Sequence, residues 1–145
     1  MKKRPLGQNF LIDSSIAQSI IQLSQIQPGE PVVEIGPGKG ILTQLLIEQT
    51  DSLTAIEIDP KLSRELQNRF NTVTSFKLIE GDAAKFDYGS LGTGLNIVSN
   101  LPYYAATHIM KKLIHFRSFI RSMTLMLQKE VVDRLTAQPG SRAYG

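Results

Sequence analysis

Four consecutive residues in the second half of the chain combine an amide, a proline and an aromatic ring. Asn100, Leu101, Pro102 and Tyr103 follow an apolar stretch, which places them at the end of a predicted strand. The N6 amine of adenine has two N–H donors and a lone pair delocalised into the ring. The Asn100 side-chain oxygen and the Leu101 carbonyl would accept both protons while Tyr103 stacks on the base. The pattern therefore indicates methyl transfer to an exocyclic or amide nitrogen.

The same four residues also suit a plain turn, because Asn and Pro are common where a chain turns after a strand. The motif alone leaves both interpretations open. The choice between a catalytic motif and a plain turn therefore depends on whether the chain also has residues that could bind a methyl donor.

A glycine loop, residues 36–40, lies between a predicted strand and a predicted helix. Its glycines let backbone N–H groups approach a ligand closely, and Gly36 and Gly38 are the candidate contacts. A dinucleotide fingerprint requires glycine at position 41, where Ile41 stands. A phosphate-binding P-loop requires Ser or Thr after a Gly-Lys pair, and this pattern is also missing. The spacing therefore favours S-adenosyl-L-methionine as cofactor.

Two carboxylates follow the next predicted strands. Glu57 lies about twenty residues beyond the loop, where an acidic residue accepts hydrogen bonds from ribose hydroxyls. Asp82 follows the third strand and would accept from the cofactor's adenine amine, with the small Ala83 leaving room for the ring. Asp59 precedes Pro60 and is interpreted as a helix cap.

Apolar runs and turn signals predict alternating helices and strands. The expected helices cover residues from 13–14 to 28–29, 41–49, 60–70, 105–116 and 129–137, and the expected strands cover 31–35, 53–58, 76–79 and 95–100. A further apolar run covers 123–127, and 83–94 is expected to be irregular. This alternation predicts an α/β fold with a doubly wound, mostly parallel sheet. Ligands bind such sheets beyond the carboxyl ends of the strands, where all the candidate residues fall.

Composition narrows the function classes. The chain has 145 residues, 41% of them hydrophobic, which suits one domain. It lacks cysteine and has two separated histidines, so no metal site is expected. Neither a membrane span nor a signal peptide is apparent, and a cytoplasmic location is expected. The net charge of +3 permits nucleic-acid binding, and basic residues cluster at Lys2, Lys3 and Arg4 and at Lys111, Lys112, His115, Arg117 and Arg121.

Taken together, these motifs resemble the rRNA adenine N6,N6-dimethyltransferase family, in the branch that acts on small-subunit rRNA. The resemblance is carried by residues 7–11, 34–40, 57–59, 81–83, 100–103, 127–131 and 139–145. It implies a Rossmann-like class I methyltransferase fold. By resemblance, Asn9 and Leu11 close over adenosylmethionine, Gly36 contacts it, Glu57 holds the ribose and Asp82 the adenine, and Asn100 lines both methyl donor and target.

The resemblance also implies a reaction and a partner. Family members transfer methyl groups to N6 of two adjacent adenosines near the 3′ end of 16S rRNA, within the pre-30S ribosomal subunit, during ribosome biogenesis. Residues 1–145 would form the N-terminal catalytic domain. We expect this domain to lack its last strands, and the C-terminal helical RNA-binding domain to be absent.

Three alternatives remain at this point. A large-subunit rRNA methyltransferase of the macrolide-resistance type shares the motifs and the chemistry. Protein and DNA amino-methyltransferases usually carry Asn-Pro-Pro-Tyr or Asp-Pro-Pro-Tyr, which Leu101 disfavours. A noncatalytic nucleic-acid-binding relative is disfavoured by the intact glycine loop, Glu57 and Asp82.

Overall fold

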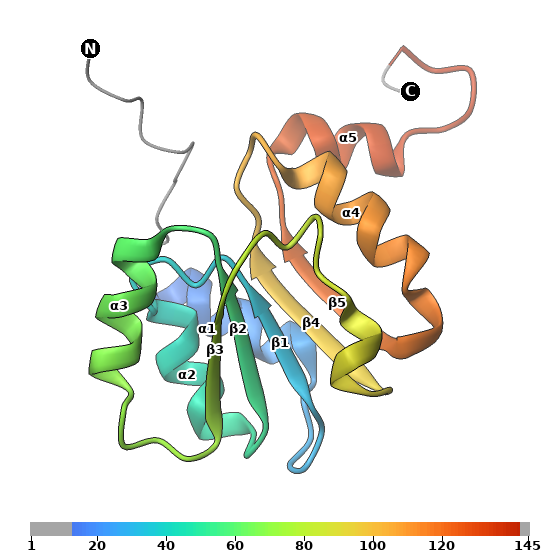
Figure 1. Ribbon diagram of the computed structural model, residues 1–145. Coiled ribbons are helices and arrows are strands. Elements are labelled where there is room, and N and C mark those ends of the chain that lie inside the picture. The colour runs from blue at the N-terminus through green and yellow to red at the C-terminus, as the bar shows by residue number, and fades with distance from the viewer. Residues whose placement is uncertain (1–12, 143–145) are drawn as a thin grey trace.

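Five parallel strands form one sheet in the order β3-β2-β1-β4-β5 (Figure 1). The computed structural model describes residues 13–142. The elements are α1 (Ser14–Ser24), β1 (Val32–Ile35), α2 (Ile41–Gln49), β2 (Leu53–Glu57), α3 (Pro60–Arg69), β3 (Phe76–Glu80), η1 (Tyr88–Leu91), β4 (Leu95–Asn100), α4 (Ala106–His115), η2 (Arg117–Phe119), β5 (Ile120–Met126) and α5 (Lys129–Thr136). The predicted α/β class and parallel sheet are confirmed.

Two hydrophobic clusters cover the two faces of the sheet. The cluster on one face joins Ala17 of α1 and Leu46 of α2 to strand residues such as Val98. The cluster on the other face joins Ile109 and other residues of α4 to strand residues, and it includes Tyr88 of η1. In Figure 1, α4 lies in front of the sheet while α1 and α2 lie behind it. The sheet is therefore doubly wound.

The first helix is shorter than predicted. Asp13 caps it as expected, accepting hydrogen bonds from the backbone N–H groups of Ser15 and Ile16. The helix ends at Ser24, not at Pro28-Gly29, because Gln25 adopts the left-handed conformation with φ 49°. Leu23, near the end of this helix, is 74% exposed although its side chain is apolar. Tertiary packing buries Ala17 and Ile20 instead.

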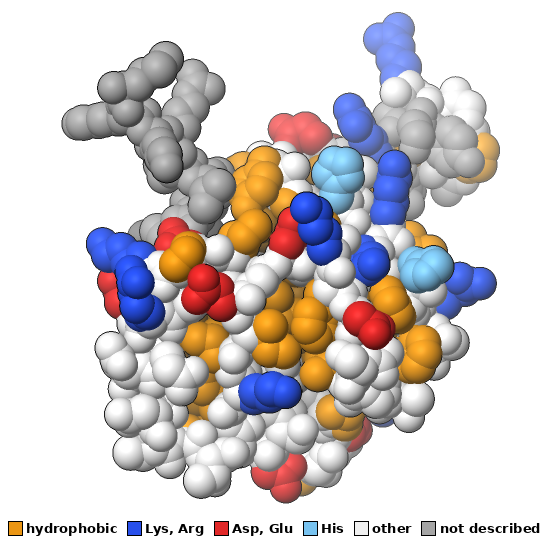
Figure 2. Space-filling model, in the orientation of Figure 1, with side chains coloured by type: hydrophobic (Ala, Val, Ile, Leu, Met, Phe, Trp, Pro, Cys, Tyr) orange, Lys and Arg blue, Asp and Glu red, His pale blue; other side chains and the backbone are white. Residues whose placement is uncertain are grey.

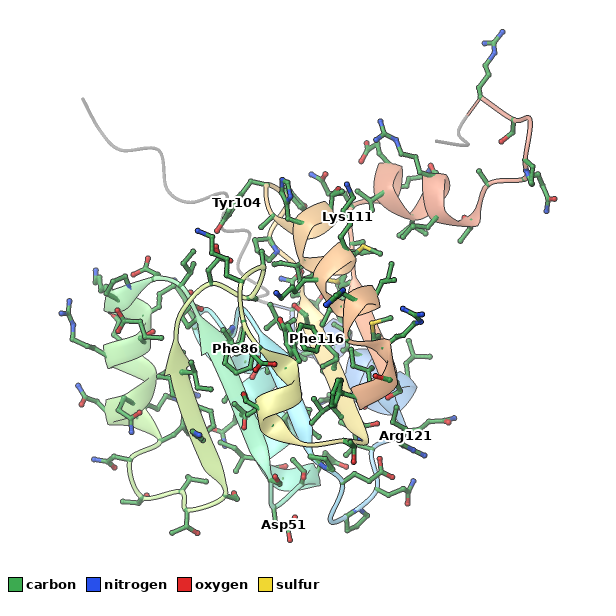
Figure 3. All side chains as sticks on the ribbon, turned by 45° about the vertical axis from the view of Figure 1, so that its right-hand side comes forward. Asp51, Phe86, Tyr104, Lys111, Phe116 and Arg121 are labelled. Atoms are coloured by element: carbon green, nitrogen blue, oxygen red, sulfur yellow. The ribbon has the colours of Figure 1, made fainter. Side chains whose placement is uncertain are left out.

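The irregular connection 83–94 contains a short 3₁₀ helix that packs on the front of the sheet. Tyr88 is fully buried there, and its hydroxyl donates to the Ala83 carbonyl at 2.8 Å. Its ring meets Phe86 and Phe116 edge to face, and Figure 3 shows these two rings close together in front of the sheet. The aromatic cluster anchors the chain segment that follows Asp82.

Glycine is required at position 40 for two reasons. Gly40 has φ 83°, a conformation that side chains rarely adopt. A Cβ there would lie 2.9 Å from Leu66 Cδ2 and 3.3 Å from Phe70 Cε2. The end of the glycine loop is thus packed tightly against α3.

We expect Gly40→Ala to destabilise the protein by about 2–5 kcal/mol, the sum of a left-handed strain of about 1–2 kcal/mol and an overpacking cost of about 1–3 kcal/mol. Gly29→Ala is the matched control, because Gly29 has φ 84° but a Cβ at this position would meet no atom within 4 Å. Urea unfolding of both variants measures the difference. Equal losses of stability would show that α3 does not constrain the loop.

Candidate functional site

A cavity of about 730 Å³ lies at the carboxyl ends of β1, β2, β3 and β4. This volume is typical of small-molecule sites, which span roughly 300–1,000 Å³. Figure 2 shows hydrophobic side chains in the hollow beside α4. The cavity brings together part of the site predicted from the sequence. The predicted residues that line it are Gly36, Gly38, Glu57, Asp82, Ala83, Asn100 and Pro102.

The glycine loop forms one wall of the cavity. Gly36 and Gly38 both have positive φ, 66° and 58°. The Gly36 N–H donates to the Ile56 carbonyl at 2.9 Å, which ties the loop to β2. A Cβ at Gly36 would lie 3.8 Å from Pro102 Cδ and 4.0 Å from the Asn100 carbonyl oxygen. The loop therefore runs directly beside the Asn-Leu-Pro-Tyr turn.

Glu57 is buried at the end of β2 and is 3% exposed. Its Oε2 accepts from the Gly38 N–H at 3.0 Å, and its Oε1 accepts from the Asp59 N–H at 3.1 Å. Burial raises the pKa of this carboxyl, while the two backbone bonds oppose the shift. Each carboxylate oxygen has a further lone pair, so Glu57 retains acceptor capacity for hydroxyl donors in the cavity.

Asp82 and Ala83 form the wall beyond β3. Asp82 Oδ1 accepts from the Ala84 N–H at 2.9 Å, which fixes the turn. Ala83 is buried, and its carbonyl holds the Tyr88 hydroxyl. Asp82 is half-buried and lines the cavity, so its carboxylate faces the same space as Ala83.

The Asn-Leu-Pro-Tyr turn is held by the sheet. Asn100 ends β4 in register with Met126, and the Leu101 N–H donates to the Met126 carbonyl at 3.1 Å. The Leu101 side chain is buried, so only its backbone is available to a ligand. Asn100 and Pro102 line the cavity.

Sequence reasoning chose Tyr103 and overlooked its neighbour. Tyr103 is 46% exposed and is not part of the cavity wall in the described structure, whereas Tyr104 is. Figure 3 shows Tyr104 at the rim. The stacking role of Tyr103 stays a prediction, and the adjacency of two tyrosines in the sequence was the signal for the second ring.

The predictions on cofactor contacts near the N-terminus, on metal sites and on membrane spans can be compared with the structure only for residues 13–142. Asn9 and Leu11 lie outside the described residues. Inside them, the structure has no cluster of His, Asp or Glu that would hold a metal ion. No helix in the described part combines the length and apolar character that a membrane span requires.

The family model for ribosomal RNA adenine dimethylases matches residues 1–145. The chain belongs to the ribosomal RNA adenine dimethylase family. This outcome confirms the resemblance inferred from the sequence motifs.

The chain is also similar to named bacterial relatives. It is 45% identical to the ribosomal RNA small subunit methyltransferase A of Aromatoleum aromaticum, over 99% of the chain and 54% of the relative. It is 46% identical to the same-named protein of Thiobacillus denitrificans, over 99% of the chain and 56% of the relative. The chain thus spans about half the length of the curated relatives it matches.

Solved structures confirm the class I methyltransferase fold. A dimethyladenosine transferase from Plasmodium falciparum superposes with a TM-score of 0.83 at 29% identity, covering 94% of this chain and 50% of that one. The 23S rRNA methyltransferase ErmE superposes with a TM-score of 0.80 at 25% identity, covering 87% and 50%.

A second buried carboxyl in the cavity, Glu34, was not predicted from the sequence. Glu34 is 1% exposed, and its Oε2 accepts from the Thr43 hydroxyl at 2.7 Å. Its Oε1 has no hydrogen-bond partner among the described residues. Burial, together with the nearby Glu57 charge, raises the pKa of Glu34 to about 8. The signal was a carboxylate inside the otherwise apolar strand β1.

We expect Glu34→Gln to gain stability relative to the native chain as pH rises. The ordinary pKa of the carboxyl is 4.5 and the folded value is about 8. Between these values the native state keeps a proton that the unfolded state has lost, so native stability falls by up to about 1.4 kcal/mol per pH unit. Gln cannot ionise, so it removes this loss.

Urea unfolding at pH 5, 6, 7 and 8 measures the effect, with Glu48→Gln at an exposed position of α2 as the matched control. Parallel stability curves for Glu34→Gln and the native chain would show that Glu34 does not hold a proton in the folded state.

Proposed function

We propose that this chain provides the S-adenosyl-L-methionine-binding and methyl-transfer part of an rRNA adenine N6,N6-dimethyltransferase. Its target is N6 of two adjacent adenosines near the 3′ end of small-subunit rRNA, and its partner is the pre-30S ribosomal subunit. The names of the relatives from Aromatoleum aromaticum and Thiobacillus denitrificans support the small-subunit assignment. Residues 1–145 correspond to the N-terminal catalytic domain.

The observation that carries this proposal is the convergence of four strand ends on one cavity. Gly36 after β1, Glu57 at the end of β2, Asp82 after β3 and Asn100 at the end of β4 all line it. The two carboxylates fit the cofactor, because its ribose hydroxyls and adenine amine donate hydrogen bonds that carboxylates accept. The positive φ values of Gly36 and Gly38 leave the loop backbone open for close approach.

When bound, adenosylmethionine supplies an electrophilic methyl group on a positively charged sulfur. The residues of the chain then have to align the target nitrogen with that methyl and keep water out. Asn100 Oδ1 and the Leu101 carbonyl would accept hydrogen bonds from the two N6–H groups and direct the nitrogen lone pair out of the ring. Pro102 fixes the backbone of this turn, and the neighbouring tyrosines present rings for stacking.

We expect Glu57→Ala to weaken adenosylmethionine binding at least tenfold, because hydrogen bonds to a charged group contribute about 1.5–3 kcal/mol each. Isothermal titration calorimetry with the 145-residue chain measures this. Glu65→Ala, at an exposed position of α3, is the matched control and should bind like the native chain. Native-like binding by Glu57→Ala would remove this residue from the cofactor site, and a folded native chain that binds no cofactor would contradict the proposal.

We expect Tyr103→Ala to lower kcat/KM for adenine methylation by about 5- to 150-fold, since base stacking on an aromatic ring contributes about 1–3 kcal/mol. Tyr104→Ala is the comparison, because Tyr104 lines the cavity and Tyr103 does not. The assay measures methyl transfer from labelled adenosylmethionine to small-subunit RNA. A larger loss in Tyr104→Ala than in Tyr103→Ala would assign the stacking ring to position 104.

A further inference from the structure

A stripe of basic and imidazole side chains runs along α4. His108, Lys111, Lys112 and His115 are spaced at i, i+3, i+4 and i+7, so they share one face of the helix. All four line the same cavity as the cofactor-binding candidates. Lys85, from the connection between β3 and η1, joins them in the lining. We refer to these five residues as the basic groove.

Within residues 13–142, the lysines of the basic groove have no ion-pair partner. The ion pairs of this described part are Arg121 with Glu30 and Lys129 with Asp133. Lys85 and Lys111 are exposed, and Lys112 lies over the Phe116 ring at 5.2 Å from its centre. The sequence of α4 contains no carboxylate. The groove therefore presents uncompensated positive charge.

The groove continues from the point where the target base is proposed to enter. α4 begins at Ala106, a few residues after the turn that contains Asn100 and Pro102. Figure 3 shows Lys111 on α4 and Tyr104 at the upper rim of the molecule, and Figure 2 shows Lys, Arg and His side chains gathered over α4 beside the hydrophobic hollow. A nucleotide with its base at Asn100 leaves its sugar and phosphate at this rim.

The geometry points to a binding site for the phosphate backbone of the RNA strand next to the target adenosine. The stripe from His108 to His115 spans about 10 Å at about 1.5 Å per residue, which matches about three stacked nucleotides at about 3.4 Å each. Lysine ammonium groups and imidazole N–H groups are donors that phosphate oxygens accept. This inference rests on the proposed function for the identity of the strand.

The charge distribution favours this occupant over the cofactor. The carboxylates Glu34, Glu57 and Asp82 line the cavity at the ends of β1, β2 and β3, where the proposed cofactor offers hydrogen-bond donors and a positive sulfur. The basic groove lies on α4 and the β3–η1 connection instead. The β3–η1 connection carries two acidic residues, Asp82 at the cofactor end and Asp87, which caps η1 by accepting from the Gly89 N–H at 3.0 Å.

The experiment measures binding of a fluorescent single-stranded RNA of twelve nucleotides, containing two adjacent adenosines, to the 145-residue chain at several salt concentrations. Each phosphate contact to a single strand contributes about 0.7 to the slope of log affinity against log salt. The double variant Lys111→Ala/Lys112→Ala is therefore expected to lower the slope by about 1.4 and the affinity about 25-fold at about 0.1 M salt. Lys85→Ala, on a different segment, is expected to lower the slope by about 0.7.

Lys61→Ala/Lys77→Ala is the matched control, because it removes the same charge from exposed positions on α3 and β3. It should keep nearly the native slope. Three outcomes would overturn the inference. They are an equal loss of slope in this control, native-like slopes in both groove variants, and no RNA binding by the native chain at low salt.

Titration of adenosylmethionine into the same preparations separates this inference from the proposed function. Cofactor binding should be native-like in all three variants, which also shows that they are folded. A native chain that binds RNA through the groove but binds no cofactor would contradict the proposed function and support the groove. Cofactor binding by the native chain, with native RNA affinity in the groove variants, would support the proposed function and contradict the groove.

Discussion

All five strands of the sheet run in the same direction, and the candidate site depends on this constraint. Parallel pairing puts Ile35 beside Ile56 and Ser99, so the segments after β1, β2 and β4 start from one edge. A shift of one residue in any pairing would turn the Glu57 or Asn100 side chain to the other face of the sheet. The buried strand residues on both faces fix the register, and the register in turn fixes the site.

The glycine loop is held from two sides by different kinds of contact. On the cavity side, its Gly38 N–H binds the Glu57 carboxylate. Behind it, Arg69 Nη1 of α3 donates to the Lys39 carbonyl at 2.8 Å, and the guanidinium lies 4.9 Å from the centre of the Phe70 ring. These contacts add to the one turn within the loop, in which the Gly40 N–H donates to the Pro37 carbonyl at 2.9 Å. A loop held in this way is prepared for a ligand before the ligand arrives, which reduces the entropy lost on binding.

Much of this arrangement could be predicted from the sequence, because its signals are local. The apolar runs of β1, β2 and β4 end in glycine or polar residues, and Asp59-Pro60 marks a helix start that the structure confirms with two backbone hydrogen bonds to the Asp59 carboxylate. The predicted end of α1 was wrong because Gln25 adopts a left-handed conformation, which glutamine rarely does. The burial of Glu34 and the position of Tyr104 depend on tertiary packing, so the carboxylate within an apolar strand and the pair of adjacent tyrosines only marked them as candidates.

The electrostatics of the cavity are consistent with the two charged ligands proposed for it. Glu34 and Glu57 repel each other, so with the pKa of Glu34 at about 8 the pair carries less than two negative charges near neutral pH. This lowers the cost of burying the two carboxyls, and Glu57 also accepts hydrogen bonds from two backbone N–H groups. The positive side chains lie on α4 and the β3–η1 connection, away from the ends of β1 and β2. The proposed RNA strand would thus be attracted to one part of the cavity and repelled from the other, which would order it relative to the proposed methyl donor.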